Sequence, residues 1–219
     1  MKITRNISKY IFRGYDIRGV YGKDLFEDTA YTIGKSYATI LKNKYGNDTV
    51  IVGHDNRLSS DTLSEALIKG IIDSGVNVLN IGLVTTSMLY YANELQKNYA
   101  GIMVTASHNP KEYNGFKIAF DKKGEICGDE IVEFMNYTLN ENFNDGVGKE
   151  EKLDIKAKYT DMIVSKFDFK NRKKVVVDCG NGTGSIIVHD IFSKLNLDVT
   201  YIFSESDPNF PNHHPDPAE

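Results

Sequence analysis

Short apolar runs alternate along the chain with longer segments in which apolar residues recur every three or four positions. The first pattern predicts buried strands, and the second predicts helices packed on a sheet. Strands are predicted at 49–52, 76–81 and 100–104, and a helix at 60–74 ends before Gly75. The succession predicts an α/β fold in which a sheet is flanked by helices.

Beyond these elements the pattern predicts a hairpin and then a domain boundary. The hairpin arms are 116–120 and 125–127, and the polar, glycine-containing segment 140–151 has no clear period. The elements predicted after it are a helix at 153–167, a strand at 174–177, a helix at 186–195 and a strand at 199–203. We therefore predict one unit at 1–145 and a second, incomplete α/β unit at 152–219, with too few strands to close a sheet.

The composition is that of a folded, water-soluble protein, with 41% hydrophobic and 26% charged residues. A net charge of -4 gives no electrostatic reason for nucleic acid to be the main partner. The N-terminus is too polar for a signal peptide, and no apolar run reaches the roughly 20 residues that a membrane span requires. Cys127 and Cys179 lack metal-ligand spacing. We expect a cytoplasmic protein with no membrane or nucleic-acid partner.

A serine lies directly after the third predicted strand, in the sequence TASHNP at 105–110. Ligands bind at the carboxyl ends of strands in open α/β sheets, so Ser107 is a candidate nucleophile. Neighbouring side chains on an extended segment point to opposite sides, and we therefore expect His108 to be poorly placed to deprotonate Ser107. The alternative is a turn formed around Asn109 and Pro110.

Three cationic side chains could surround an anion at this serine. Arg18 and Arg57 carry guanidinium groups that match phosphate oxygens, and Lys117 adds a point charge or a proton-transfer group. Glycines at 14 and 19 bracket the Arg18 segment and favour a backbone bent tightly around a ligand. The alternative is that all three are solvated surface charges.

Two motifs near the end of the chain have a functional and a structural interpretation. The sequence DCGNGTG at 178–184 follows a strand and precedes a helix, as in a glycine-rich anion site, but a tight turn explains it equally well. His213, His214 and Asp216 could bind a metal, although the prolines of 211–217 favour a rigid surface strap.

Taken together, these motifs resemble the N-terminal portion of the α-D-phosphohexomutases, the phosphoglucomutase/phosphomannomutase family. The motifs occur in the family's order: FRGYDIRG at 12–19, DNRLS at 55–59, TASHNP at 105–110 with YNGFK at 113–117, DCGNGTG at 178–184, and FPNHHPDP at 210–217. TASHNP is similar to the phosphoserine loop of that family. The resemblance implies phosphohexomutase domain I followed by an incomplete domain II.

The resemblance also implies a reaction. A phosphorylated Ser107 would donate its phosphoryl group to mannose or glucose phosphate, form a 1,6-bisphosphate, and recover a phosphoryl group from its other end. This interconverts hexose 6-phosphate and hexose 1-phosphate. The implied roles are catalysis by Ser107, Arg18, Lys117 and His108, binding of phosphate or substrate by Arg57, Asn109 and Tyr15, and Mg²⁺ held partly by the Ser107 phosphate. Glucose or mannose 1,6-bisphosphate would be the activator.

The chain also departs from the family pattern. Family members have about four similar domains, whereas this sequence reaches Glu219 inside the second and lacks the Asp-Gly-Asp-Gly-Asp-Arg metal loop. We therefore expect weak or absent Mg²⁺ binding, no appreciable mutase activity from these 219 residues alone, and self-association through the incomplete second unit. The alternative function is that of a non-catalytic sugar-phosphate-binding or regulatory protein derived from a mutase.

Overall fold

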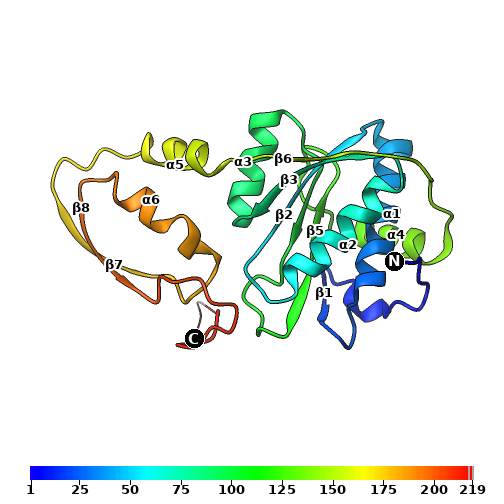
Figure 1. The fold of residues 1–219 in the computed structure, drawn as a ribbon, viewed down its shortest axis with the longest axis horizontal. Helices are drawn as coiled ribbons and strands as arrows, with labels where there is room; N and C mark the ends of the chain where they lie inside the picture. The colour runs from blue at the N-terminus through cyan, green and yellow to red at the C-terminus, as the bar shows by residue number, and fades with distance from the viewer. Residues whose placement is uncertain (217, 219) are drawn as a thin grey trace.

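A computed structural model describes residues 1–216 and 218, and its centre is a six-stranded sheet (Figure 1). The strands are β1 (Ile17–Val20), β2 (Thr49–His54), β3 (Asn77–Leu83), β4 (Gly101–Val104), β5 (Tyr113–Ala119) and β6 (Glu150–Lys152), in the order β1-β5-β4-β2-β3-β6. β2, β3, β4 and β6 run parallel, and β5 is antiparallel to both β4 and β1. The predicted α/β sheet is confirmed.

Helices cover both faces of this sheet. On one face lie α1 (Glu27–Tyr45), α2 (Ser60–Ile72) and α4 (Asp129–Asn140), which share a core with Ile102 and Phe116. On the other face lies α3 (Thr86–Gln96), against which α5 (Lys156–Val164) packs, and the smaller core here includes Met103. The helix predicted at 60–74 is α2, and the one predicted at 153–167 is the shorter α5.

Helix α1 is absent from the predicted elements, because polar residues interrupt its apolar period. Helix α1 lies so deep that several of these polar side chains are buried. Ser36 Oγ lies 2.7 Å from Thr138 Oγ1, and Lys35 Nζ donates to Asp145 Oδ1 at 2.8 Å. Burial of a polar group is tolerated when it is hydrogen-bonded in this way.

Glycines allow α1 and α2 to pack with their backbones in contact. A Cβ atom at Gly34 would lie 2.2 Å from the Leu67 carbonyl oxygen, and one at Gly70 would lie 2.1 Å from the Tyr31 carbonyl oxygen. Any side chain at either position would force the helices apart.

The predicted hairpin is wrong in its extent. The first arm, β5, begins earlier and pairs with β4 and β1, while the second arm is reduced to one bridge between Ala119 and Glu125. The Ile126 amide also donates to the Ile118 carbonyl at 2.8 Å. The arm ends because Gly128, with a φ of 55°, turns the chain into α4.

The polar segment predicted as a boundary contributes an edge strand to the first unit. Its last residues form β6, which pairs with β3. Gly148 makes this approach possible, because a Cβ atom there would lie 2.0 Å from the Val76 carbonyl oxygen. The division into units at 1–145 and 152–219 stays a prediction.

Within the described residues, a separate two-stranded sheet lies beside the six-stranded one (Figure 1). Its strands are the parallel β7 (Lys173–Asp178) and β8 (Leu197–Ile202), connected through the 3₁₀ helix η2 (Thr183–Ile186) and α6 (Val188–Phe192). We call the six-stranded sheet with its helices the first unit, and the two-stranded sheet with its helices the second unit. The single helix predicted at 186–195 is wrong, because Ile187 (φ -130°, ψ -19°) separates η2 from α6. Pro217 of the predicted strap, and Glu219, lie outside the described residues.

Candidate functional site

The candidate nucleophile lies in a tight turn three residues beyond β4. Ser107 has a φ of 55°, in the left-handed region that residues other than glycine rarely adopt. The turn is held locally by the Ser107 amide, which donates to Thr105 Oγ1 at 2.9 Å, and by the Asn109 amide, which donates to the Ala106 carbonyl at 3.1 Å. The Ser107 side chain is exposed. Backbone strain of this kind is concentrated at functional sites.

This geometry corrects the expectation about His108. Ser107 Oγ and His108 Nδ1 are 3.3 Å apart, so the imidazole is adjacent to the hydroxyl after all. The expectation was wrong because it assumed an extended segment, whereas the positive φ of Ser107 rotates the two side chains toward each other.

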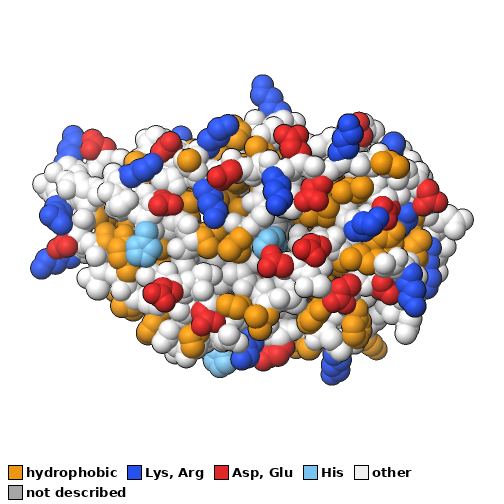
Figure 2. All heavy atoms as spheres, viewed as in Figure 1, with side chains coloured by type: hydrophobic (Ala, Val, Ile, Leu, Met, Phe, Trp, Pro, Cys, Tyr) orange, Lys and Arg blue, Asp and Glu red, His pale blue; other side chains and the backbone are white. Residues whose placement is uncertain are grey.

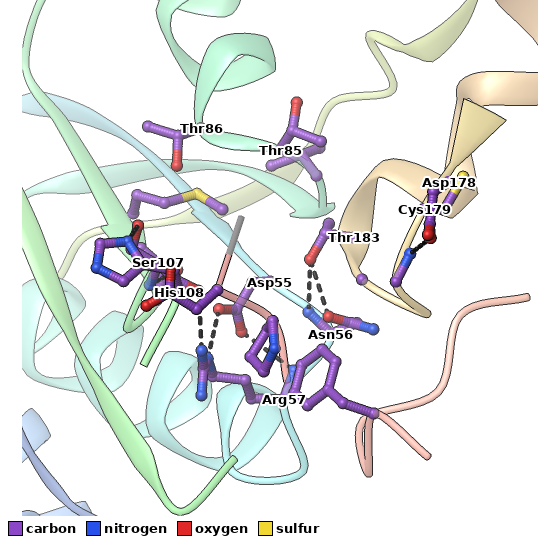
Figure 3. A pocket seen from close by; sticks show the side chains of 18 of the residues that line it. Asp55, Asn56, Arg57, Thr85, Thr86, Ser107, His108, Asp178, Cys179 and Thr183 are labelled. Carbon is purple, nitrogen blue, oxygen red and sulfur yellow. Dashed lines mark hydrogen bonds and ion pairs between the residues drawn. The ribbon is translucent and has the colours of Figure 1, made fainter. Parts of the chain in front are cut away.

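Arg57, which is only 3% exposed, holds the serine turn through hydrogen bonds from its guanidinium group. All three guanidinium nitrogens donate to protein oxygens: Nε to Asp55 Oδ2 (3.2 Å), Nη1 to the carbonyls of Pro110 (2.7 Å) and Tyr113 (3.1 Å), and Nη2 to those of Ser107 (2.8 Å) and Asn109 (2.7 Å). The guanidinium therefore fixes the backbone on both sides of the serine, as Figure 3 shows in part. A contact between Arg57 and phosphate would require one of these bonds to open.

Arg57 is itself held in place by a buried polar network. Asp55 also accepts the Arg57 amide at 3.1 Å and the Ser60 hydroxyl, while Asn114 Nδ2 donates to Ser59 Oγ at 2.8 Å and to Ser60 Oγ at 2.9 Å. Burial lowers the pKa of the Arg57 guanidinium, and the charge of Asp55 opposes that shift. An arginine stays protonated in proteins, so the cation is retained.

Arg18 reaches the turn from β1. Its Nη1 donates to Asn109 Oδ1 at 2.6 Å, and its Nη2 pairs with the Asp16 carboxylate. The Arg18 side chain is 11% exposed, and its buried Nε has no hydrogen-bond partner among the described residues. Arg18 is therefore joined to the candidate site through Asn109. Tyr15, in the turn before β1, is 59% exposed.

Lys117 lies on the same face of the sheet as Arg18. Phe116 and Ile118, on either side of Lys117, and Ile17, next to Arg18, belong to the core beneath α1 and α2. Because side chains alternate between faces along a strand, Lys117 and Arg18 both lie on the opposite face. Lys117 is also the antiparallel partner of Met103, which lines the cavity described next. Lys117 Nζ donates to a Glu125 carboxylate oxygen at 2.8 Å.

A cavity of about 840 Å³ lies between the two units, next to Ser107 (Figure 3). The first unit contributes lining residues that include Ser107, His108 and Thr85, and the second contributes Asp178 and Thr183, among others. Among the described residues, neither Arg18 nor Lys117 lines this cavity. The structure thus brings the serine, the histidine and the DCGNGTG turn together around one opening.

Asn56, which sequence analysis missed, joins the two units. Its side-chain Nδ2 donates to the Asn181 carbonyl and to Ser206 Oγ, both at 2.9 Å. Its Oδ1 accepts the Thr183 hydroxyl at 2.9 Å, and its amide donates to the same hydroxyl at 3.2 Å. The residue is adjacent to Arg57 in the sequence, but only the tertiary structure shows what it contacts.

His213, in the predicted strap, contacts two protein oxygens. His213 Nε2 lies 3.3 Å from Asp178 Oδ1, and its Nδ1 lies 2.7 Å from the His214 carbonyl oxygen. The bond to His214 and then the pair with Asp178 raise the pKa of His213. Over residues 1–216 and 218, no three His, Cys, Asp or Glu side chains are grouped so as to hold a metal ion.

The face in Figure 2 carries both apolar and charged side chains. Acidic and basic side chains are interspersed there, with no large area of one sign. In the described part of the chain, every helix is too short or too polar to traverse a lipid bilayer.

The fold and the site define a class: an α/β protein with a strained serine turn at the carboxyl end of a sheet strand, held by arginines and facing a second α/β unit. Residues 9–144 match the family model "Phosphoglucomutase/phosphomannomutase, alpha/beta/alpha domain I", and residues 157–219 match the model for alpha/beta/alpha domain II. The chain therefore belongs to the phosphoglucomutase/phosphomannomutase family.

Individual relatives agree with this assignment. The chain is 43% identical over 210 residues to a phosphomannomutase/phosphoglucomutase of Pseudomonas putida, covering 95% of this chain and 45% of the relative. It is 40% identical over 216 residues to a phosphoglucomutase of Neisseria gonorrhoeae, covering 98% of this chain and 46% of the relative. A crystal structure of a family protein from Burkholderia thailandensis matches with a TM-score of 0.91 and 37% identity, covering 97% of this chain and 48% of that one. The chain thus spans about half the length of these relatives.

Proposed function

We propose that this chain is the phosphoserine-bearing part of a phosphohexomutase that interconverts hexose 6-phosphate and hexose 1-phosphate, with glucose or mannose as the sugar. The observation that carries the proposal is the Ser107 turn. Its hydroxyl is exposed beside a cavity of about 840 Å³, while Arg57 holds the backbone on both sides of it. Phosphoryl transfer depends on positioning and on cations around the phosphate, and this turn provides a positioned hydroxyl.

The proposed reaction has two transfers at Ser107. In the first, a sugar hydroxyl gives up its proton and attacks the phosphorus of phosphorylated Ser107, the bond from phosphorus to Oγ breaks, and Oγ takes up a proton. The sugar now carries phosphate at both ends. After the sugar reorients, Ser107 Oγ loses its proton and attacks the other phosphorus, and the sugar oxygen leaves with a proton. The phosphoserine is restored, and the phosphate position on the sugar has changed.

Each neighbouring side chain has a proposed role. His108 Nδ1, 3.3 Å from Ser107 Oγ, is the proposed acceptor for the hydroxyl proton, in the tautomer that leaves Nδ1 free. Arg18 contributes positive charge near the transferring group, and Lys117 exchanges a proton with the sugar oxygen. Tyr15 and Asn109 are proposed to contact substrate. Arg57 keeps the turn in place, and its predicted phosphate contact is a secondary role.

Mg²⁺ is proposed to bind through the oxygens of phosphorylated Ser107. Mg²⁺ prefers oxygen ligands in octahedral geometry, and it neutralises charge on a transferring phosphate. The Ser107 hydroxyl and its phosphate would be compatible donors. Since no group of three acidic or histidine ligands lies within the described residues, we propose weak affinity for this chain by itself.

The test is covalent labelling of Ser107. The chain is incubated with glucose 1,6-bisphosphate, and its intact mass and peptides are analysed. We expect one added phosphate on Ser107, no addition in Ser107→Ala, and normal addition in the exposed control Ser165→Ala. No phosphate on the wild-type chain, or addition that persists in Ser107→Ala, contradicts the proposal. Binding of the bisphosphate by calorimetry without phosphorylation would instead favour a non-catalytic sugar-phosphate-binding protein.

The chain alone is proposed to lack appreciable mutase turnover and to associate with itself through the second unit. The exposed side chains of Val176 (67%), Ile202 (38%) and Phe203 (39%) support the second statement, because apolar surface next to unpaired strand edges favours association. A coupled assay for glucose 6-phosphate tests the first statement, and size-exclusion chromatography tests the second. Rapid turnover, or a compact monomer, would contradict them respectively.

A further inference from the structure

The Lys117 ammonium group has a carboxylate partner that the proposed reaction does not use. Lys117 Nζ lies 2.8 Å from Glu125 Oε2, and the two side chains are only 19% and 20% exposed. Two other lysine-carboxylate pairs are open on both sides: Lys194 and Asp161 are 50% and 69% exposed, and Lys44 and Glu133 are 64% and 71% exposed. An open pair contributes little, whereas a part-buried pair holds its geometry better.

A third side chain holds the carboxylate. The Tyr90 hydroxyl, from α3, donates to Glu125 Oε1, the oxygen that Lys117 does not use. Burial, and then the hydrogen bond and charge of Glu125, raise the pKa of Tyr90, so it stays a neutral donor. Glu125 thus accepts one bond from α3 and one from β5.

The backbone of Glu125 is fixed as well. It forms a bridge with Ala119 at the end of β5, and the next residue, Ile126, donates its amide to the Ile118 carbonyl at 2.8 Å. The Ile126 side chain is buried in the main core. The carboxylate therefore extends from an anchored position and not from a free loop.

The chemistry of lysine makes such an anchor useful. A lysine ammonium group ends a flexible four-carbon stem, and catalysis requires it to stay within a fraction of an ångström of its working position. Lys117 lies on the face of the sheet that carries Arg18, and its strand partner Met103 lines the cavity beside Ser107.

We propose that Glu125 is a positioning residue that, held by Tyr90, fixes the direction of the Lys117 ammonium group for phosphoryl transfer at Ser107. This proposal rests on the proposed function, in which Lys117 exchanges a proton with the sugar. Glu125 does not contact the sugar, and Tyr90 acts only through Glu125.

Two readouts test the proposal separately. The first is the rate at which an amine-reactive acetylating reagent modifies Lys117, measured by peptide mass spectrometry with Lys122 and Lys123 as internal references. We expect a severalfold increase in Glu125→Gln and a smaller increase in Tyr90→Phe. The matched control is Glu133→Gln, which removes the carboxylate of the open pair with Lys44 and should leave Lys117 labelling unchanged.

The second readout is the rate of Ser107 phosphorylation by glucose 1,6-bisphosphate. We expect Glu125→Gln to slow it by about tenfold to a hundredfold, the cost of misplacing a catalytic group. In a Lys117→Ala background the same substitution should cause no further loss, because Glu125 acts through Lys117. A merely structural role would still slow the reaction in that background.

The outcomes separate this proposal from the function on which it rests. Unchanged Lys117 labelling in both Glu125→Gln and Tyr90→Phe overturns it, as does slowing that persists without Lys117. If the wild-type chain takes up no phosphate, the proposed function fails, and the labelling rates alone decide whether Glu125 positions the ammonium group.

Discussion

The two sides of the cavity beside Ser107 differ in how firmly they are built. On the first side, all four residues of β4 are buried, and the serine turn that follows is bonded to a nearly inaccessible arginine. On the second side, β7 and β8 alternate between exposed and half-buried residues, and Val176 is 67% exposed. The first unit therefore holds the serine turn by itself. The second unit is joined to the first by the side-chain bonds of Asn56 and by the smaller apolar core, which includes Ile187.

This contrast makes the first unit the rigid part of the site. Strain at Ser107 persists only where the surrounding structure determines it, and the Arg57 bonds to the turn do so. Substitutions in the first unit should therefore cost much more stability than equivalent ones in the second.

The largest effect is expected for Arg57→Ala. It removes the bonds to the serine turn and leaves Asp55 as an unpaired buried charge, which costs about 3–5 kcal/mol of unfolding free energy. Urea denaturation measures this cost. The control is Arg172→Ala, because Arg172 is 68% exposed and 3.7 Å from Asp198, and it should change stability by less than about 1 kcal/mol. Similar values for the two variants would refute the contrast.

Gly34→Ala is expected to be the next most damaging change. The new Cβ atom would lie 2.2 Å from the Leu67 carbonyl oxygen, so α1 and α2 must separate, at a cost near the upper end of the range for overpacking, about 3 kcal/mol. This outweighs the gain in helix propensity, which is about 1 kcal/mol. Thermal unfolding should show a clear loss, whereas the control Gly14→Ala, with nothing within 4 Å of its Cβ position, should unfold as the wild type does.

Asn56→Ala tests the connection between the units. Losing its bonds to Asn181, Thr183 and Ser206 should cost about 1–2 kcal/mol, and the loss should appear as faster hydrogen exchange in 179–206. Exchange in the serine turn should not change, because Arg57 holds it from the first unit. The control is Asn43→Ala, an exposed residue paired with Asn144. Faster exchange at 105–110 in Asn56→Ala would show that the turn depends on the second unit.

The smallest effect is expected for Val176→Thr. Its side chain is mostly exposed on β7, so the unfolding free energy should change by less than about 0.5 kcal/mol. The same substitution at Val52, which is fully buried on β2, should cost about 1–3 kcal/mol because it buries a hydroxyl group. Equal costs in paired denaturation experiments would mean that β7 is as well covered as β2.

Much of the fold could be predicted because its strands are short apolar runs with clear ends. The strands predicted at 49–52 and 100–104 correspond to β2 and β4, and the serine was correctly expected just beyond β4. Helix α1 could not be predicted in the same way, because several polar residues along it are buried and bonded to α4 and to the segment after it. An amphipathic pattern fails where both faces of a helix are covered.

The sequence by itself determined the residue types of the site and its place at the end of a strand, because both depend on local pattern. Only the tertiary structure decided which partners those residues have. The positive φ of Ser107 places His108 next to its hydroxyl, the Arg57 guanidinium donates its hydrogen bonds to the serine turn, and Glu125 pairs with Lys117. These contacts follow from how distant segments fold against one another, and hydrophobic periodicity carries no information about such pairings.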